Sequence, residues 1–226
     1  MTENIYLFVP NIIDYLRILF AFISFYYMPT EPSTATAFYL LSGFLDAFDG
    51  HLARMLNQCS KLGAMLDQLT DRITTMCLCA TLCHLYPNYM LFFQFAMALD
   101  IFSHWMHCQS AVQRGSTSHK KIDLSANPIL RYYYHSQAVL FTMCAANELF
   151  FCMLYLNYFS TGPIIPIIGV GLWKLIWVMC FPLAVLKMLI SCIQLGAACE
   201  NYAIMDREDR SKQTTGQTIE QQKKLE

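Results

Sequence analysis

Residues 45–72 read LDAFDGHLARMLNQCSKLGAMLDQLTDR, and the organisation of the chain can be worked out from them. Four aspartates stand in this stretch as two pairs, Asp46 with Asp49 and Asp67 with Asp71. Spacings of three and four residues place both members of a pair on one helix face. Because the link between the pairs is short, the two segments are expected to form antiparallel neighbouring helices. The four carboxylates are therefore predicted to converge on one point.

The chain on either side of this stretch is strongly apolar. Of its 226 residues, 56% are hydrophobic and 14% are charged, whereas a soluble domain carries about 25% charged residues. Several apolar segments reach about 20 residues, the length that crosses a bilayer as a helix. We expect an all-α membrane protein whose helices contact membrane lipid. Its six transmembrane helices are predicted at residues 9–28, 36–56, 66–86, 89–112, 138–160 and 170–198.

The polar segments predict the domain organisation. Residues 1–200 are expected to form one membrane domain, and residues 201–226 a polar cytosolic tail. The tail is rich in Gln, Lys, Glu and Thr, which favours disorder near its end. Residues 113–137 are predicted to form a loop with a short interfacial helix. No cleavable signal peptide is expected, because the N terminus lacks a basic region followed by a cleavage site.

The distribution of basic residues predicts the orientation. The turns near 29–35, 86–89 and 160–169 contain no Lys or Arg, whereas the opposite helix ends and the tail contain several. Since positively charged loops stay cytosolic, both termini and the aspartates are expected to face the cytosol. The chain ends Lys223-Lys224-Leu225-Glu226, which resembles the dilysine retrieval signal of endoplasmic reticulum membrane proteins. That membrane is the expected location.

Composition argues against two other kinds of site. A net charge of −1 gives no basic surface for a nucleic acid. Most of the ten cysteines stand in apolar segments, where they are expected to pack as small hydrophobic residues. Cys77 and Cys79 form one close pair, but a zinc site would need a second pair at ligand spacing.

Four neighbouring carboxylates at a membrane need positive charge to balance them. One arginine does not balance four aspartates, whereas divalent cations do. Ligands that are all oxygen favour Mg²⁺ or Mn²⁺, and two ions that share them would suit phosphoryl chemistry. The alternative is a solvated acidic helix end with salt bridges to Arg54 and Arg72, which suits a single aspartate better than four.

Two glycines and an arginine extend the predicted site. Glycine inside a helix is tolerated where a backbone or a ligand must come close, which gives Gly50 and Gly63 a role, although helix packing alone also accounts for Gly63. Arg54 lies four residues after Gly50 on the same helix face, where a guanidinium can bind a diphosphate.

The stretch between Asp46 and Asp71 resembles a known signature. The pattern Asp-x-x-Asp-Gly-x-x-Ala-Arg, eight residues, then Gly-x-x-x-Asp-x-x-x-Asp is that of the CDP-alcohol phosphatidyltransferase family, and every fixed position is present. Residues 9–17 also resemble the first helix of that family. The resemblance implies six membrane helices, a site on the cytosolic side and a homodimer. It also implies residue roles: Asp46, Asp49 and Asp67 hold the metals, Asp71 touches one metal and acts as general base, and Gly50, Arg54 and Ser60 bind CDP-diacylglycerol.

The signature alone does not select the acceptor alcohol. Residues 44–51, 63–67 and 118–125 resemble animal members of the family that use free myo-inositol and form phosphatidylinositol and CMP. The residues themselves leave glycerol 3-phosphate and serine open as acceptors. Hydrogen-bonding side chains in the 113–137 segment could bind a polyol or anchor the loop at lipid headgroups; these are Asn127, Arg131, Tyr132 and Tyr133.

A carboxylate base allows direct attack of the alcohol on phosphorus, with no covalent enzyme intermediate. We therefore assign no catalytic role to His51 or His84. A divalent-cation transporter or channel is the alternative from another class, since intramembrane carboxylates often line ion paths. A catalytically silent scaffold is a third alternative, which the complete aspartate set disfavours. Asp14 could support the site, and Asp100 has no predicted role.

Overall fold

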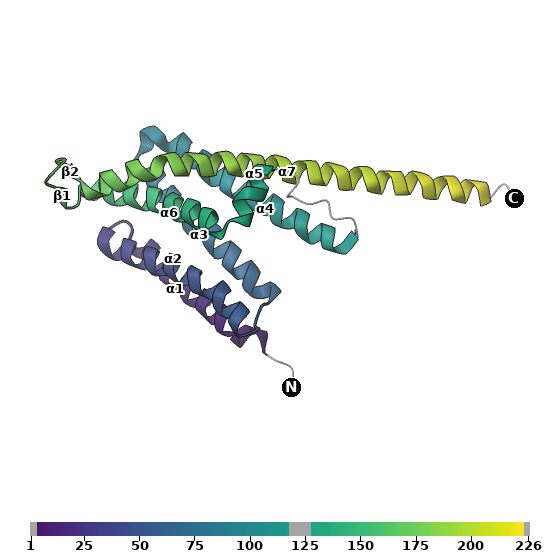
Figure 1. The fold of residues 1–226 in the computed structure, drawn as a ribbon, viewed down its shortest axis with the longest axis horizontal. Helices are drawn as coiled ribbons and strands as arrows, with labels where there is room; N and C mark the ends of the chain where they lie inside the picture. The colour runs from purple at the N-terminus through teal and green to yellow at the C-terminus, as the bar shows by residue number, and fades with distance from the viewer. Residues whose placement is uncertain (1–3, 118–127, 224–226) are drawn as a thin grey trace. The chain divides into compact units, whose positions relative to one another are not determined.

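The structure is a computed structural model that describes residues 4–117 and 128–223. Almost all of it is helical (Figure 1). In chain order the elements are η1 (Ile5–Leu7), α1 (Val9–Tyr27), α2 (Pro32–Met55), α3 (Lys61–Leu85), η2 (Pro87–Tyr89), α4 (Met90–Thr117), α5 (Pro128–His135), α6 (Gln137–Phe159), β1 (Ile164–Ile165), β2 (Val170–Gly171) and α7 (Leu172–Lys223).

Six long helices correspond to the six predicted segments, and prolines begin several of the elements. Pro32 is the first residue of α2 and Pro87 the first of η2, where the missing N–H of proline leaves no helical hydrogen bond unmade. Within the described residues, α1, α6 and residues 172–213 of α7 are long and apolar enough to cross a membrane. The chain is thus a multi-pass membrane protein, and the count of six spans stays a prediction.

The polar segments differ in part from expectation. The final helix does not end near residue 198, because α7 continues through the polar segment to Lys223. The prediction of disorder near the end of the tail is therefore wrong for the residues up to Lys223. This segment contains no proline and only one glycine, so little in it stops a helix. The short helix that was predicted within 113–137 is confirmed as α5, and residues 118–127 and 224–226 lie outside the described part.

The chain falls into two compact units. The first comprises Met1–Ala98 and Met143–Val185, and the second Leu99–Thr142 and Leu186–Glu226. The predicted membrane domain over residues 1–200 thus contains parts of both units. All four aspartates of the signature lie in the first unit, which is where the site is built.

Small residues bring α1 and α2 together in the first unit. Ala21 of α1 and Ala35 of α2 are buried. The Ser24 hydroxyl donates to the carbonyl of Ala35 at 2.8 Å, and the Ser42 hydroxyl donates to the carbonyl of Arg17 at 3.0 Å. Close approach of small residues with hydrogen bonds between helices is how membrane helices associate. The two ribbons accordingly run side by side (Figure 1).

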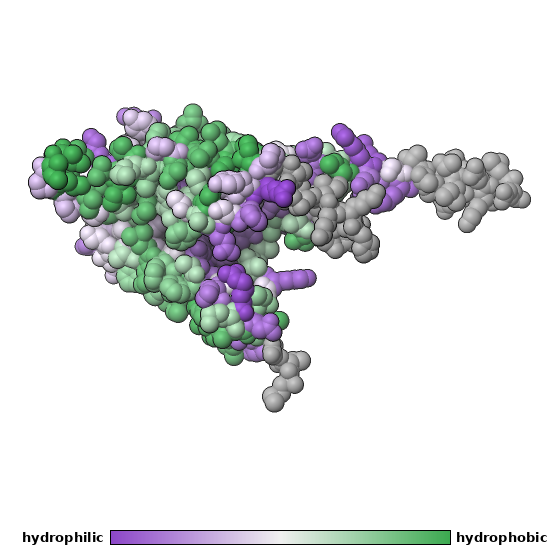
Figure 2. Space-filling view, viewed as in Figure 1, coloured by the Kyte–Doolittle hydropathy of each residue, from purple (hydrophilic) through white to green (hydrophobic). Residues whose placement is uncertain are grey.

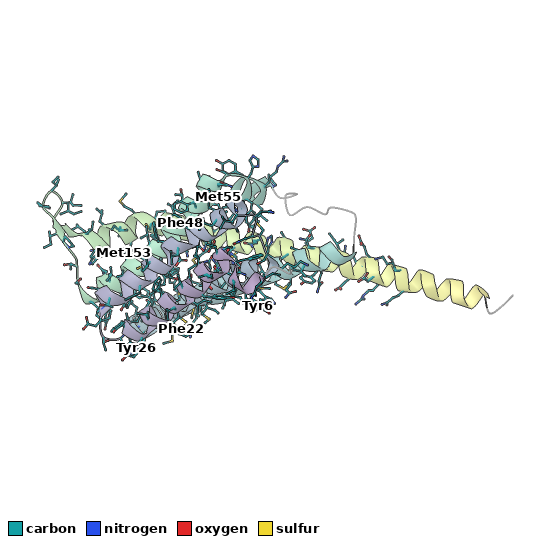
Figure 3. All side chains as sticks on the ribbon, turned by 90° about the horizontal axis from the view of Figure 1, so that it is seen from below. Tyr6, Phe22, Tyr26, Phe48, Met55 and Met153 are labelled. Atoms are coloured by element: carbon teal, nitrogen blue, oxygen red, sulfur yellow. The ribbon has the colours of Figure 1, made fainter. Side chains whose placement is uncertain are left out.

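The outer surface carries large apolar side chains. Hydrophobic residues cover much of the face shown in Figure 2. Phe22 and Tyr26 of α1 are 64% and 77% exposed, and Figure 3 labels both on that helix. In a soluble protein such surface would mark an interaction site, whereas in a membrane the lipid tails cover it. Burial and exposure thus agree with the membrane assignment.

In the second unit, Asp100, which had no predicted role, has charged partners. Its carboxylate on α4 lies 3.9 Å from the ammonium nitrogen of Lys187 on α7, which is buried. His104, one turn along α4, lies 3.5 Å from the same carboxylate. A charge inside a membrane protein usually pairs with another charge. Asp100 is therefore the partner of a buried lysine.

Candidate metal and active site

The turn between α2 and α3 brings the two aspartate pairs to the same place. Asn57 has a φ of 53°, and Gln58 donates its N–H to the carbonyl of Ala53 at 2.9 Å. This is a Schellman ending, in which asparagine tolerates the left-handed conformation. Ser60 then caps α3, because its hydroxyl accepts from the N–H of Gly63 at 2.9 Å. The chain reverses within this turn, so the ends of α2 and α3 become neighbours.

The predicted convergence of the aspartates is confirmed. In one group, oxygens of Asp14, Asp49 and Asp67 all lie within 4.8 Å of one another. In a second group, the same holds for Asp46, Asp67 and Asp71. Asp67 belongs to both groups. Asp14, which the sequence suggested as a supporting residue, joins the cluster from α1.

Arg17 stands at the centre of these carboxylates, and the sequence did not predict that role. Its side chain is only 2% exposed. Nη1 lies 3.2 Å from Asp14, 2.7 Å from Asp49 and 2.8 Å from Asp67. Nη2 lies 2.5 Å from Asp71 and also contacts Asp46. A signal existed, since Arg17 lies three residues after Asp14 on one face of an otherwise apolar segment.

The donor set fits divalent metal. Nη1 contacts every member of the first carboxylate group, and Nη2 contacts two members of the second, so each nitrogen marks a place where positive charge is stabilised. Five carboxylates face two guanidinium groups, because Arg72 also lies 3.2 Å from Asp71, so the cluster keeps three formal negative charges. Divalent cations would balance that surplus, and ligands that are all oxygen suit Mg²⁺ or Mn²⁺.

Gly50 and Arg54 form an open, positively charged place beside the carboxylates. A Cβ added to Gly50 would meet only the Arg54 guanidinium, at 3.6 and 4.0 Å, so packing against other helices does not require this glycine. Its N–H donates to the Asp49 carboxylate. Arg54 is exposed, and no ion pair to it occurs among the residues that the structure describes. A guanidinium in this state is available to bind an anion.

Gly63 is explained by packing, which was one of its two predicted roles. A Cβ at this position would lie 2.5 Å from Oδ1 of Asn11 and 3.2 Å from the Ser60 hydroxyl oxygen. Asn11 is fully buried on α1, and its Nδ2 donates to the carbonyl of Ile5 at 2.7 Å. The absence of a side chain on Gly63 therefore lets the start of α3 lie against α1.

Replacing Gly63 with Ala is expected to destabilise the protein by about 1–3 kcal/mol, because Asn11 must move and lose its bond to Ile5. Gly43 is the matched control, since a Cβ there meets nothing within 4 Å. Gly43→Ala should leave stability unchanged or raise it by up to about 1 kcal/mol. Thermal unfolding of the two purified variants measures the difference. Equal unfolding temperatures would contradict the packing role of Gly63.

Neither carboxylate group includes the other residues that were singled out from the sequence. His51 and His84 are exposed on their helices. No disulfide joins the ten cysteines; seven are buried or half-buried, as a packing role requires, whereas Cys59, Cys192 and Cys199 are exposed. Tyr132 is exposed and Tyr133 is buried, both on α5 in the second unit. Asn127 lies outside the described residues.

The sequence of this chain resembles those of known proteins. A family model described as CDP-alcohol phosphatidyltransferase matches residues 7–198. The chain belongs to this family. The match includes both helices of the signature and also Asp14 and Arg17 on α1. Members of the family use divalent metals, which agrees with the carboxylate groups.

Relatives of similar length carry one common name. A Homo sapiens protein called CDP-diacylglycerol–inositol 3-phosphatidyltransferase is 60% identical over 93% of this chain and 98% of its own length. Proteins of the same name from Drosophila melanogaster and Saccharomyces cerevisiae are 42% and 41% identical. They match 96% and 87% of this chain, and 97% and 86% of their own lengths. The family resemblance inferred from the signature is confirmed over nearly the whole chain.

Proposed function

We propose that this chain is a phosphatidylinositol synthase, which transfers a phosphatidyl group from CDP-diacylglycerol to myo-inositol and releases CMP. The observation that carries the proposal is the 60% identity to the human CDP-diacylglycerol–inositol 3-phosphatidyltransferase over nearly the full length of both chains. The carboxylate cluster supplies the chemistry that this reaction needs. Glycerol 3-phosphate and serine remain the alternative acceptors that the experiment below tests.

The site residues divide into those that hold metal and those that bind the lipid nucleotide. Asp46, Asp49 and Asp67 hold two Mg²⁺ or Mn²⁺ ions together with Asp71, and Asp14 lies within reach of the same group. When bound, the metal neutralises negative charge on the diphosphate. The guanidinium of Arg54, beside the bare backbone of Gly50, contacts the same diphosphate, and Ser60 borders it.

Asp71 is the general base in this proposal. Its side chain is 34% exposed, so a substrate hydroxyl can reach it. The carboxylate takes the proton from an inositol hydroxyl while that oxygen attacks the phosphorus that carries diacylglycerol. A phosphorus–oxygen bond forms to inositol, the bond to the bridging oxygen of the diphosphate breaks, and CMP leaves with the electron pair. No side chain becomes covalently attached, so a trapped phosphatidyl-enzyme adduct would contradict this route.

We also propose where the enzyme is located and how it assembles. Six helices cross the endoplasmic reticulum membrane, both termini face the cytosol, and the carboxylate cluster lies on the cytosolic side. The basic residues near the aspartates support this orientation. The enzyme works as a homodimer, as the family resemblance implies.

The acceptor assay tests the function directly. Purified protein receives CDP-diacylglycerol, Mn²⁺ and one labelled alcohol at a time, namely inositol, glycerol 3-phosphate or serine. Label is expected to enter lipid from inositol alone, with CMP released in equal amount. Entry from glycerol 3-phosphate but not from inositol would overturn the acceptor. Mn²⁺ flux through vesicles that survives Asp71→Asn, without lipid synthesis, would instead favour a transporter.

A further inference from the structure

Glu148 is a carboxylate in the middle of a membrane helix, and none of the roles above uses it. It is the central residue of α6 (Gln137–Phe159), one of the helices apolar enough to span a bilayer. Among the residues that the structure describes, no cation lies within ion-pair distance of it. An ionisable group at such a depth is energetically unfavourable unless it is well satisfied, and it commonly marks function.

Two hydroxyl groups from other helices satisfy this carboxylate. The Tyr39 hydroxyl of α2 donates to one oxygen of Glu148. The Thr75 hydroxyl of α3 lies 2.9 Å from the other oxygen. Tyr39 and Thr75 are both buried. Each oxygen of Glu148 thus binds a different helix, and α6 connects α2 with α3.

Both donors lie close to the aspartates along their own helices. Tyr39 precedes Asp46 by seven residues, which is two helical turns, and Thr75 follows Asp71 by four residues, which is about one turn. The Thr75 hydroxyl also lies 3.0 Å from the carbonyl of Asp71. The Thr75 hydroxyl has one hydrogen, so the Glu148 carboxylate and the Asp71 carbonyl compete for that hydrogen. A hydroxyl that donates to the carbonyl four residues back tends to bend its helix, so Glu148 can affect the shape of α3 next to Asp71.

We propose that Glu148 is a positioning residue for the carboxylate cluster: by accepting from Tyr39 and Thr75, it fixes the two aspartate-bearing helices relative to each other. Arg17 of α1 contacts the carboxylates directly, whereas Glu148 of α6 contacts the two helices that carry the signature aspartates. Residues that orient metal ligands without touching the metal typically change metal affinity or activity by about 10–100-fold when they are replaced. An effect of Glu148 on the rate of inositol transfer would rest on the proposed function, whereas its effect on metal binding does not.

The experiment measures Mn²⁺ binding without substrate. Thermal unfolding of the full-length protein is followed across a Mn²⁺ titration, and the Mn²⁺ concentration at half of the full stabilisation is recorded. The variants are Glu148→Gln, whose amide keeps one acceptor oxygen and replaces the other with an NH2 group that only donates, and Tyr39→Phe and Thr75→Val, which each remove one hydroxyl donor. Each variant is expected to raise the half-saturating Mn²⁺ by about 10–100-fold.

Two matched controls separate positioning from general stability. Tyr155 is also a buried tyrosine of the first unit, but its hydroxyl donates to the carbonyl of Met28 at 2.7 Å, at the end of α1. Tyr155→Phe should lower the unfolding temperature in EDTA and leave the half-saturating Mn²⁺ unchanged. Glu31 is exposed before α2, and Glu31→Gln should change neither quantity.

Distinct outcomes support or overturn the inference. The double variant Tyr39→Phe, Thr75→Val already lacks both hydrogen bonds to Glu148. Adding Glu148→Gln to it should therefore change the half-saturating Mn²⁺ little further. Unchanged half-saturating Mn²⁺ in Tyr39→Phe and Thr75→Val would overturn it, and those variants decide the question if Glu148→Gln does not fold. A wild-type protein that Mn²⁺ does not stabilise would also overturn it. If the variants show the expected Mn²⁺ shifts but the wild-type protein does not transfer inositol, the proposed function is refuted and the positioning role of Glu148 is not.

Discussion

Replacing Asp71 with Asn is expected to lower turnover by about 10²–10⁴-fold, which is the contribution of a well-placed general base. An amide has nearly the same shape as a carboxylate but cannot take the proton from inositol. Its oxygen can still accept from Nη2 of Arg17, so the fold should persist. Initial rates of inositol incorporation, measured at saturating CDP-diacylglycerol and Mn²⁺, give the effect.

Comparing Asp71→Asn with Asp67→Asn shows whether Asp71 acts as a base or only as a metal ligand. Asp67 belongs to both carboxylate groups, so this change should mainly raise the Mn²⁺ concentration needed for activity. Asp71→Asn should instead lower the rate even at saturating Mn²⁺. If excess Mn²⁺ restores the Asp71→Asn variant to the wild-type rate, Asp71 is a ligand and not the base.

Replacing Arg17 with Met is expected to destabilise the metal-free protein strongly, because five carboxylates lose their shared partner. Breaking a buried ion pair by removing one member destabilises a protein by about 3–5 kcal/mol. The side chains of Asp46, Asp67 and Asp71 are 34–44% exposed, so solvent screening places the effect at the lower end of that range. Thermal unfolding in EDTA measures the loss.

Mn²⁺ should return part of the stability that Arg17→Met removes, since a divalent cation supplies positive charge to the same oxygens. The gain in unfolding temperature on adding Mn²⁺ is therefore expected to be larger in Arg17→Met than in the wild type. Arg54→Met is the control, because Arg54 is exposed. It should unfold at the wild-type temperature and bind CDP-diacylglycerol more weakly. Equal unfolding temperatures of Arg17→Met and the wild type in EDTA would contradict the central role of Arg17.

Much of the fold and of the ligand set could be predicted because both depend on local features of the chain. Helix positions follow from apolar segments that prolines and polar turns interrupt, and they were right to within a few residues for most helices. The end of α7 was wrong because a polar segment without a helix breaker can be helical or disordered. Spacings of three and four residues were enough to place Asp46 with Asp49 and Asp67 with Asp71.

The contacts that could not be predicted join helices that are distant in the sequence. Arg17 reaches Asp49 and Asp71 across 32 and 54 residues, and Tyr39 reaches Glu148 across 109. Any of several basic residues could have served the aspartates as a partner. Spacing also could not show that Gly63 makes room for Asn11.

The linear order of residues was sufficient for the membrane character, the two aspartate pairs and the oxygen chemistry of the site, since each depends on residue type and on short-range helical periodicity. The arrangement of Arg17 among the carboxylates, and of Glu148 between α2 and α3, needed the packed structure. Its physical reason is that polar groups inside a membrane must find partners on other helices, and which helix lies within reach depends on how all of them pack.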